Sequence, residues 1–221
     1  MPSAPPAELV AVGGRPLTAK GRATRQRIVE TASRLMLEVG VERATIDDIQ
    51  QVAGVNTSQL YHYFTDKNAL ILAVIDHQTQ TVLDIHRSSL ERVEGFDGLV
   101  AWRNMIVDVL QAQQCVGGCP IGSLASDLVE TDLVARKALQ GSFAAWEGLL
   151  RDGLSTMRDR GILPPGLDVE RSALALLAAV QGGLLLSQTR RDTIALEAAL
   201  DAAIDHLRSL SASARSREAQ P

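Results

Sequence analysis

Four consecutive residues near position 60 combine hydrogen-bonding chemistry with aromatic bulk. The chain has seven aromatic residues (two Trp, two Tyr and three Phe), and Tyr61, Tyr63 and Phe64 lie within four positions. A phenol beside a phosphate backbone can donate a hydrogen bond while its ring packs, and His62 adds a donor between the two tyrosines. Just before them, Gln59 carries an amide of the type that pairs with both N6 and N7 of adenine. Ordinary half-buried packing of the tyrosines, a surface His62 and a solvated Gln59 are the alternatives.

Two cysteines, Cys115 and Cys119, form the second candidate for chemistry. A Cys-x3-Cys pair can act as a thiol switch or as half of a metal site, but no second cysteine pair and no His-x3-His spacing completes four ligands. Inert buried thiols are therefore the favoured interpretation. Two cysteines are too few for a disulfide framework, which agrees with a reducing cytoplasmic compartment.

The sequence gives little support to an enzyme. The four histidines lack a metal-binding spacing, no glycine-rich phosphate loop follows a strand, and no nucleophile with its base is recognisable (His62, His77, His86, His206). We therefore expect no catalytic residues, no cofactor and no metal.

Hydrophobic spacing and proline placement predict the elements that carry these residues. Prolines are absent from residues 17–119, so helices can run there with few interruptions. One face of a first helix is apolar (Ile28, Ala32, Leu35, Met36, Val39), and Gly40 can end it. A capping box at Thr45 and Asp48 begins a short second helix, which Gly54 breaks. Further helices are predicted over residues 57–63, 67–89, 99–115, 122–129, 131–160, 168–189 and 192–210. No sustained period-two alternation appears, so the fold class is all-α, with about nine helices.

Charge is distributed unevenly along the chain. The formal net charge is -4, yet residues 1–34 hold six basic residues against two acidic ones. This asymmetry suggests that the N-terminal end meets a polyanion, although a solvated tail is equally compatible. The longest apolar stretch, residues 173–186, is interrupted and is shorter than the roughly 20 residues that span a membrane, and no secretory signal is visible. We therefore expect a cytoplasmic protein without a membrane partner.

Two short helices packed on a longer first helix outline a helix-turn-helix, whose second short helix lies in the major groove. The strings TIDDI (residues 45–49), AGV (53–55) and LYHYFTDKNAL (60–70) resemble the DNA-binding domain of the tetracycline-repressor (TetR) family of bacterial transcriptional regulators. The resemblance covers about residues 22–72. It implies core positions for Leu60 and Phe64, base contacts from Thr57, Ser58 and Gln59, and phosphate contacts from a further set (Thr45, Tyr61, His62, Tyr63, Lys67).

The sequence departs from the family pattern at two places. Gln50 stands where the family usually has a small alanine that faces the recognition helix, and Ser58 and Gln59 replace a usual glycine followed by a small hydroxyl residue. We expect Gln50 to affect the packing of the two short helices and Gln59 to alter specificity. Basic residues before and within the first helix can add phosphate or minor-groove contacts or form a solvated tail (Arg15, Lys20, Arg22, Arg25, Arg27).

The resemblance also divides the chain. It implies a flexible basic arm (1–19), the DNA-binding domain (20–66), a ligand-binding and dimerisation domain (67–211) and a flexible tail (212–221). The last two predicted helices resemble the family's dimer interface, a four-helix bundle from two chains. Packing of these apolar stripes within one chain is the alternative (Leu185, Leu186, Leu196, Leu200, Ile204, Leu207).

Two further features concern the ligand-binding domain. The string GCPIGSLASDL (residues 118–128) resembles one branch of the family. Six residues fall on helices that line the family's pocket, and each is equally compatible with plain core (Trp102, Met105, Phe143, Trp146, Leu150, Gln181). The sequence thus predicts a homodimeric regulator, most simply a repressor that a small, largely apolar effector releases from a pseudo-palindromic double-stranded DNA operator. A helical thiol redox or metal sensor using Cys115 and Cys119 is the rival hypothesis.

Overall fold

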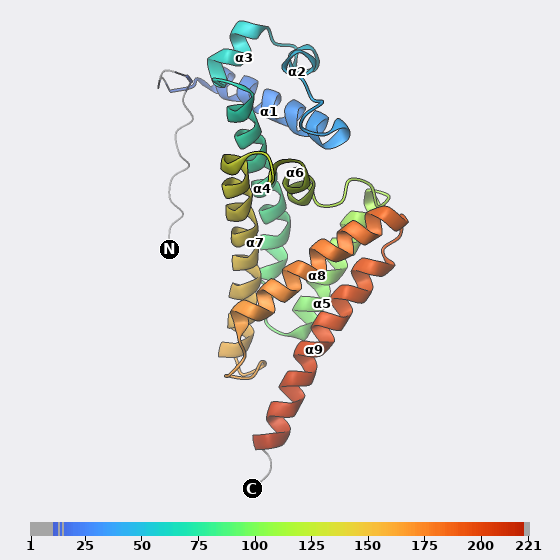
Figure 1. The fold of residues 1–221 in the computed structure, drawn as a ribbon. Coiled ribbons are helices and arrows are strands. Elements are labelled where there is room, and N and C mark those ends of the chain that lie inside the picture. Colours follow the sequence, from blue (N-terminus) through green and yellow to red (C-terminus); the bar gives the residue numbers. More distant parts are fainter. Residues whose placement is uncertain (1–10, 13, 15, 219–221) are drawn as a thin grey trace. The chain divides into compact units, whose positions relative to one another are not determined.

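The computed structural model describes residues 11–218 apart from 13 and 15, with side chains described as far as Ser213. Over this part of the chain the structure is all-α and contains nine helices, as the sequence predicts (Figure 1). They are α1 (Ala19–Val39), α2 (Ile46–Ala53), α3 (Thr57–Tyr63), α4 (Lys67–Leu90), α5 (Phe96–Ala112), α6 (Pro120–Leu128), α7 (Leu133–Asp159), α8 (Val169–Arg190) and α9 (Ile194–Glu218).

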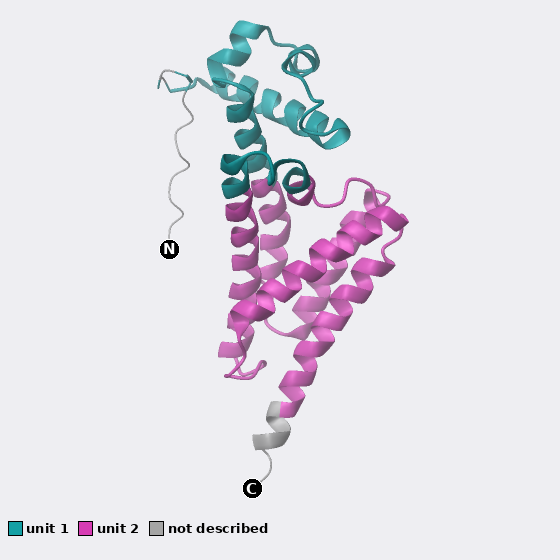
Figure 2. Ribbon diagram, in the orientation of Figure 1, with its two compact units in different colours: residues 1–78, 124–138 teal, residues 79–123, 139–221 magenta. Residues whose placement is uncertain are grey.

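Two compact units make up the structure, and their boundaries fall within α4, α6 and α7 (Figure 2). The first unit contains residues 1–78 and 124–138, and the second contains residues 79–123 and 139–221. Each unit therefore combines segments that lie far apart in the sequence.

Side-chain caps fix most helix starts. Asp66 Oδ1 accepts from the Ala69 N–H over 2.8 Å at the start of α4, and Asp168 Oδ1 accepts from the Arg171 N–H over 2.9 Å at the start of α8. At α6 the first residue is a proline, whose missing N–H costs nothing at that position.

The predicted ends of two helices are wrong by three to eight residues. The helix expected over 99–115 runs from Phe96 to Ala112, because Gln114 and Cys115 take left-handed φ values of 54° and 55° and end it. The helix expected to end at residue 210 continues to Glu218 and so extends into the predicted tail.

The core of the second unit depends on close approach of α8 and α9. Gly183 makes this possible, since a Cβ there would lie 2.7 Å from the Cα of Leu196. Arg103 on α5 binds Glu197 and Asp201 on α9, each over 2.9 Å. By length and composition alone α8 could cross a membrane, but its inward face packs on α9 as a core helix does.

Candidate functional site

The helix-turn-helix begins with a capping box at α2. The Thr45 hydroxyl accepts from the Asp48 N–H over 3.1 Å and donates to the Asp48 carboxylate over 2.5 Å. The one hydrogen of the Thr45 hydroxyl is therefore already donated within α2's own cap. This arrangement favours a role for Thr45 in starting α2, and its predicted phosphate contact stays a prediction.

The turn between α2 and α3 is built on Gly54, which takes the left-handed φ of 62° that glycine adopts most readily. The next helix opens with a second capping box. Asn56 Oδ1 accepts from the Gln59 N–H over 2.8 Å, and Gln59 Oε1 accepts from the Asn56 N–H over 3.0 Å. The amide oxygen that the predicted adenine pair requires is thus engaged in the cap.

Gln50 connects the two short helices. The Thr57 hydroxyl donates to Gln50 Oε1 over 3.1 Å, while Gln50 Nε2 is buried without a hydrogen-bond partner in the described part of the chain. The residue that breaks the family pattern therefore holds the start of α3. Thr57, Ser58 and Gln59 are all exposed at that start, as base-contacting residues must be.

The aromatic cluster divides into core and surface. Leu60 and Phe64 are buried, in agreement with the expectation, and the Arg25 guanidinium lies 5.0 Å from the Phe64 ring centre. Tyr61 is 45% exposed, and the ring of His62 meets that of Tyr63 edge to face at 4.9 Å. α3 thus presents polar aromatic tips on one side and an apolar core face on the other.

Lys67 makes contacts that the sequence did not indicate. Its ammonium donates to the carbonyl of Val41 over 2.8 Å and to that of Glu42 over 3.2 Å. Two of its three donors are therefore engaged by the loop between α1 and α2. These contacts favour a role for Lys67 in holding that loop, and its predicted phosphate contact stays a prediction.

Asp127, near the end of α6, reaches the same loop. Its Oδ2 accepts from the Val41 N–H over 2.9 Å, across 86 positions of sequence. Asp127 and Lys67 border an open cavity of about 740 Å³ within the first unit. Sequence reasoning missed this contact, although Asp127 lies in the distinctive string at residues 118–128.

Four of the five basic residues predicted to contact DNA near the N-terminus lie in α1 (Lys20, Arg22, Arg25, Arg27). Arg22 donates to the Leu17 carbonyl over 2.7 Å, and Arg27 donates to the Ala53 carbonyl at the end of α2 over 2.9 Å. The Val12 N–H donates to the His62 carbonyl over 3.0 Å, which attaches this segment to α3. Arg15 lies outside the described residues.

In the second unit, two of the predicted pocket residues, Trp102 and Trp146, contact His86. Trp102 Nε1 donates to His86 Nδ1 over 2.9 Å, and the His86 and Trp146 ring centres are 4.4 Å apart. Burial lowers the pKa of His86 to about 4, so the imidazole is neutral at neutral pH. Trp146 Nε1 is buried, and no hydrogen-bond acceptor in the described chain reaches it.

The other members of the predicted pocket differ in burial. Leu150 is buried in the core, whereas Met105, Phe143 and Gln181 are half-buried. Gln181 Nε2 donates to the Cys119 sulfur over 3.5 Å. The six residues therefore mix core positions with partly accessible ones.

The two cysteines are buried and free. Cys119 Sγ accepts from the Gly122 N–H over 3.4 Å at the first turn of α6, and burial raises the pKa of this thiol. A protonated thiol is a poor nucleophile and a poor metal ligand. Among the described residues no group of three His, Cys, Asp or Glu side chains is placed to hold a metal. These features favour a structural role for Cys119.

The predicted dimer interface is only partly available to a second chain. Leu185 and Leu186 on α8 are 63% and 54% exposed. The four predicted residues on α9 are buried in their own chain, because α9 turns its apolar stripe toward α8 and α5 (Leu196, Leu200, Ile204, Leu207). For these four, burial favours the alternative of packing within one chain.

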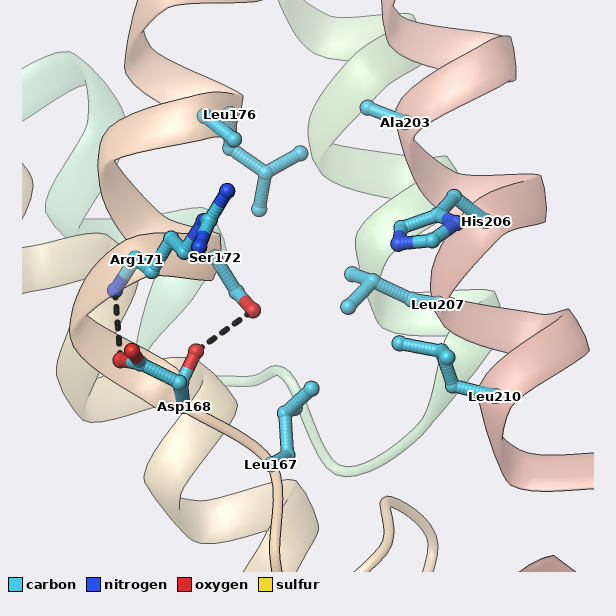
Figure 3. Close-up of a pocket in the computed structure, with 10 residues that line it drawn as sticks. Leu167, Asp168, Arg171, Ser172, Leu176, Ala203, His206, Leu207 and Leu210 are labelled. Carbon is cyan, nitrogen blue, oxygen red and sulfur yellow. Dashed lines mark hydrogen bonds between the residues drawn. The ribbon is translucent and has the colours of Figure 1, made fainter.

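A cavity of about 260 Å³ lies between α8 and α9 (Figure 3). Leucine and alanine make up six of its ten lining residues, and Arg171, Asp168 and His206 add polar groups. The Ser172 hydroxyl donates to the Asp168 carbonyl over 2.7 Å beside it. The cavity is thus an apolar hollow with charged groups around it.

Comparisons with known proteins agree with this geometry. Residues 28–74 match the family "Bacterial regulatory proteins, tetR family", and residues 96–202 match "Transcriptional regulator LmrA/YxaF-like, C-terminal domain". The HTH-type transcriptional regulator TtgR of Pseudomonas putida is 30% identical over 163 residues, which cover 72% of this chain and 77% of that protein. The HTH-type transcriptional repressor ComR of Escherichia coli is 25% identical over 175 residues, covering 78% of this chain and 82% of that protein.

A solved structure shows the same fold. The TetR transcriptional regulator from Chloroflexus aurantiacus superposes with a TM-score of 0.73 at 25% identity, covering 86% of this chain and 96% of that one. The two family matches, which together span more than half of the chain, and the 30% identical relative identify a regulator rather than an enzyme. The chain therefore belongs to the TetR family of DNA-binding transcriptional regulators and carries an LmrA/YxaF-like C-terminal domain.

Proposed function

We propose that the chain is a cytoplasmic repressor that binds a pseudo-palindromic DNA operator as a homodimer and is released by a small, largely apolar effector. The observation that carries the proposal is the exposed polar start of α3 beside exposed aromatic tips, on a helix-turn-helix that belongs to a DNA-binding family. The name of the Escherichia coli relative, a transcriptional repressor, supports repression over activation.

The DNA contacts are assigned from the exposure of each side chain and its position on the helix-turn-helix. Thr57, Ser58 and Gln59 meet base edges, since all three are exposed at the start of α3. Three residues further along α3 meet phosphates and fix the register (Tyr61, His62, Tyr63). Thr45 and Lys67 act indirectly, by starting α2 and by holding the α1–α2 loop.

A test of these contacts compares two kinds of variant. Tyr63→Phe removes a phosphate donor, so we expect weaker binding to operator and random duplex alike. Ser58→Ala removes a base-facing group, so it should reduce affinity for the operator more than for random DNA. Fluorescence anisotropy titrations on both duplexes measure the two effects. If Ser58→Ala loses the same affinity for operator as for random duplex, Ser58 does not read a base.

Dimerisation is assigned to the outward face of α8 with the exposed part of α9. Leu174, Leu185 and Leu186 are more than half exposed on α8, and Ile194 at the start of α9 is 60% exposed. Exposed apolar side chains of this size on two neighbouring helices suit a second copy that contributes the same two helices. Two-fold symmetry of the protein then imposes two-fold symmetry on the operator.

The effector site is assigned to the surroundings of Trp146 and Trp102. A buried indole N–H without an acceptor costs about 1–3 kcal/mol, so a ligand oxygen that accepts from Trp146 Nε1 gains affinity there. The neighbouring His86 is neutral, which disfavours a strongly charged effector. We therefore expect an uncharged, mostly apolar molecule that carries a hydrogen-bond acceptor.

Intrinsic fluorescence tests this site, because the chain has two tryptophans and both contact His86. A compound library screened by tryptophan emission should yield ligands whose binding weakens with Trp146→Phe. The same ligands must weaken operator binding, and operator must weaken ligand binding by the same factor. A ligand that binds without this reciprocal effect does not support the repressor mechanism.

The Asp127 contact supports a route between ligand and DNA binding. Asp127 on α6 hydrogen-bonds the loop that follows α1, and Lys67 holds the same loop. A shift of α6 on ligand binding therefore changes the support of the helix-turn-helix. We expect Asp127→Ala to reduce the effector response more than operator affinity, with Glu130→Ala, three residues further on, as the matched control.

A further inference from the structure

Gln59 belongs both to the cap of α3 and to the surface assigned to DNA. Its backbone N–H donates to Asn56 Oδ1 over 2.8 Å, and its side-chain Oε1 accepts from the Asn56 backbone N–H over 3.0 Å. A backbone N–H can only donate, so the amide atom that faces it must be the oxygen. The capping box therefore fixes which way the Gln59 amide is turned.

The cap leaves the two amide hydrogens of Gln59 available to a partner. Gln59 is exposed, and in the described part of the chain no acceptor takes the two hydrogens of Nε2. Bidentate pairing with adenine requires oxygen and nitrogen to advance together to the base edge. An oxygen held 3.0 Å from the Asn56 nitrogen is instead drawn back to the backbone of its own helix.

We propose that Gln59 selects guanine and rejects adenine in each operator half-site. Guanine presents two acceptors in the major groove, O6 and N7, whereas adenine presents N7 beside its N6 amino donor. The free amide hydrogens of Gln59 match the first pattern and oppose the second. This inference rests on the proposed DNA binding and names the base that one residue of that interface recognises.

The same cap explains why adenine is disfavoured even if the side chain moves. To read adenine, Gln59 must leave Asn56 and give up one of the two reciprocal bonds of the capping box. Guanine is read with both bonds in place. Base choice and helix capping thus favour the same side-chain conformation.

Selection of bound duplexes from a random library, with wild type and Gln59→Glu, tests the proposal. Glutamate preserves the cap, because one carboxylate oxygen still accepts from the Asn56 N–H, and the other becomes an acceptor facing DNA. Wild type should enrich guanine at one position of each half-site, and Gln59→Glu should enrich cytosine there, whose N4 amino group donates. Gln59→Met, of similar length, should lose preference at that position alone.

Base analogues in the enriched duplex give a second readout. Inosine in place of that guanine keeps O6 and N7 and should bind as before, whereas adenine should weaken binding by about 5- to 150-fold in wild type and have little effect on Gln59→Met. Enrichment of adenine or thymine at the Gln59-dependent position overturns the inference, as does an unchanged site preference in Gln59→Met. If no sequence is enriched at all, the proposed DNA binding fails and the inference fails with it.

Discussion

Buried His86 makes the stability of the second unit depend on pH. The folded-state pKa is about 4 against an ordinary value of 6.5, and desolvation by burial is the cause. The unfolded chain therefore binds a proton at a pH where the folded chain does not. The contribution of neutral His86 to stability is fully present above the unfolded-state pKa, and it is lost as the pH falls toward the folded-state pKa. From about pH 7.5 to about pH 5 this proton removes roughly 2 kcal/mol from the free energy of unfolding.

Urea unfolding followed by far-UV circular dichroism, at one fixed protein concentration, measures this loss. The control is His86→Gln, which cannot titrate but still offers an oxygen to Trp102 Nε1, the donor that lies 2.9 Å from His86 Nδ1. We expect the stability of this variant to fall by about 2 kcal/mol less than that of wild type over the same range. If the free energy of unfolding changes with pH equally in the two proteins, the assignment of a neutral, buried His86 is refuted.

Two further predictions concern α8 and α9. Gly183→Ala places a Cβ 2.7 Å from the Leu196 Cα and should lower the free energy of unfolding, measured with heat or urea, by about 1–3 kcal/mol. Gly182→Ala has nothing within 4 Å of the new Cβ and should raise it by about 0.5–1 kcal/mol. Equal effects of the two substitutions would show that α9 can move away freely. Leu185→Asp with Leu186→Asp should give a folded monomer in light scattering, whereas Leu200→Asp should unfold the chain, because its side chain is fully buried. A dimer that survives the double substitution would place the interface elsewhere.

Local signals predicted the fold well. The Thr45 cap and the glycine at position 54 act over a few residues, so their sequence patterns mark the two ends of α2 directly. The helix ends that were missed have weaker local signals. The end of α5 depends on left-handed residues at 114 and 115 that are not glycine, and α9 continues through a serine-rich segment that resembled a tail.

The candidate site was predicted in position but not in chemistry. Residue types identified α3 as the exposed polar helix and Thr45 as a helix cap, yet they did not reveal that Gln59 and Asn56 form a second capping box. The contacts of Lys67 and Asp127 join segments far apart in the sequence, which a single sequence does not report. An apolar stripe on α9 was assigned to a second chain because periodicity alone does not distinguish partners within a chain from partners between chains.

Recovery of bound duplexes from a random DNA library most directly tests the central claim that α3 of a two-fold dimer reads an operator. The account predicts an enriched inverted repeat whose half-site centres lie about one helical turn or a multiple of it apart, and affinity for it roughly 10³-fold or more above random duplex. Enrichment of no sequence, or of one that binds no tighter than random duplex, would contradict the account.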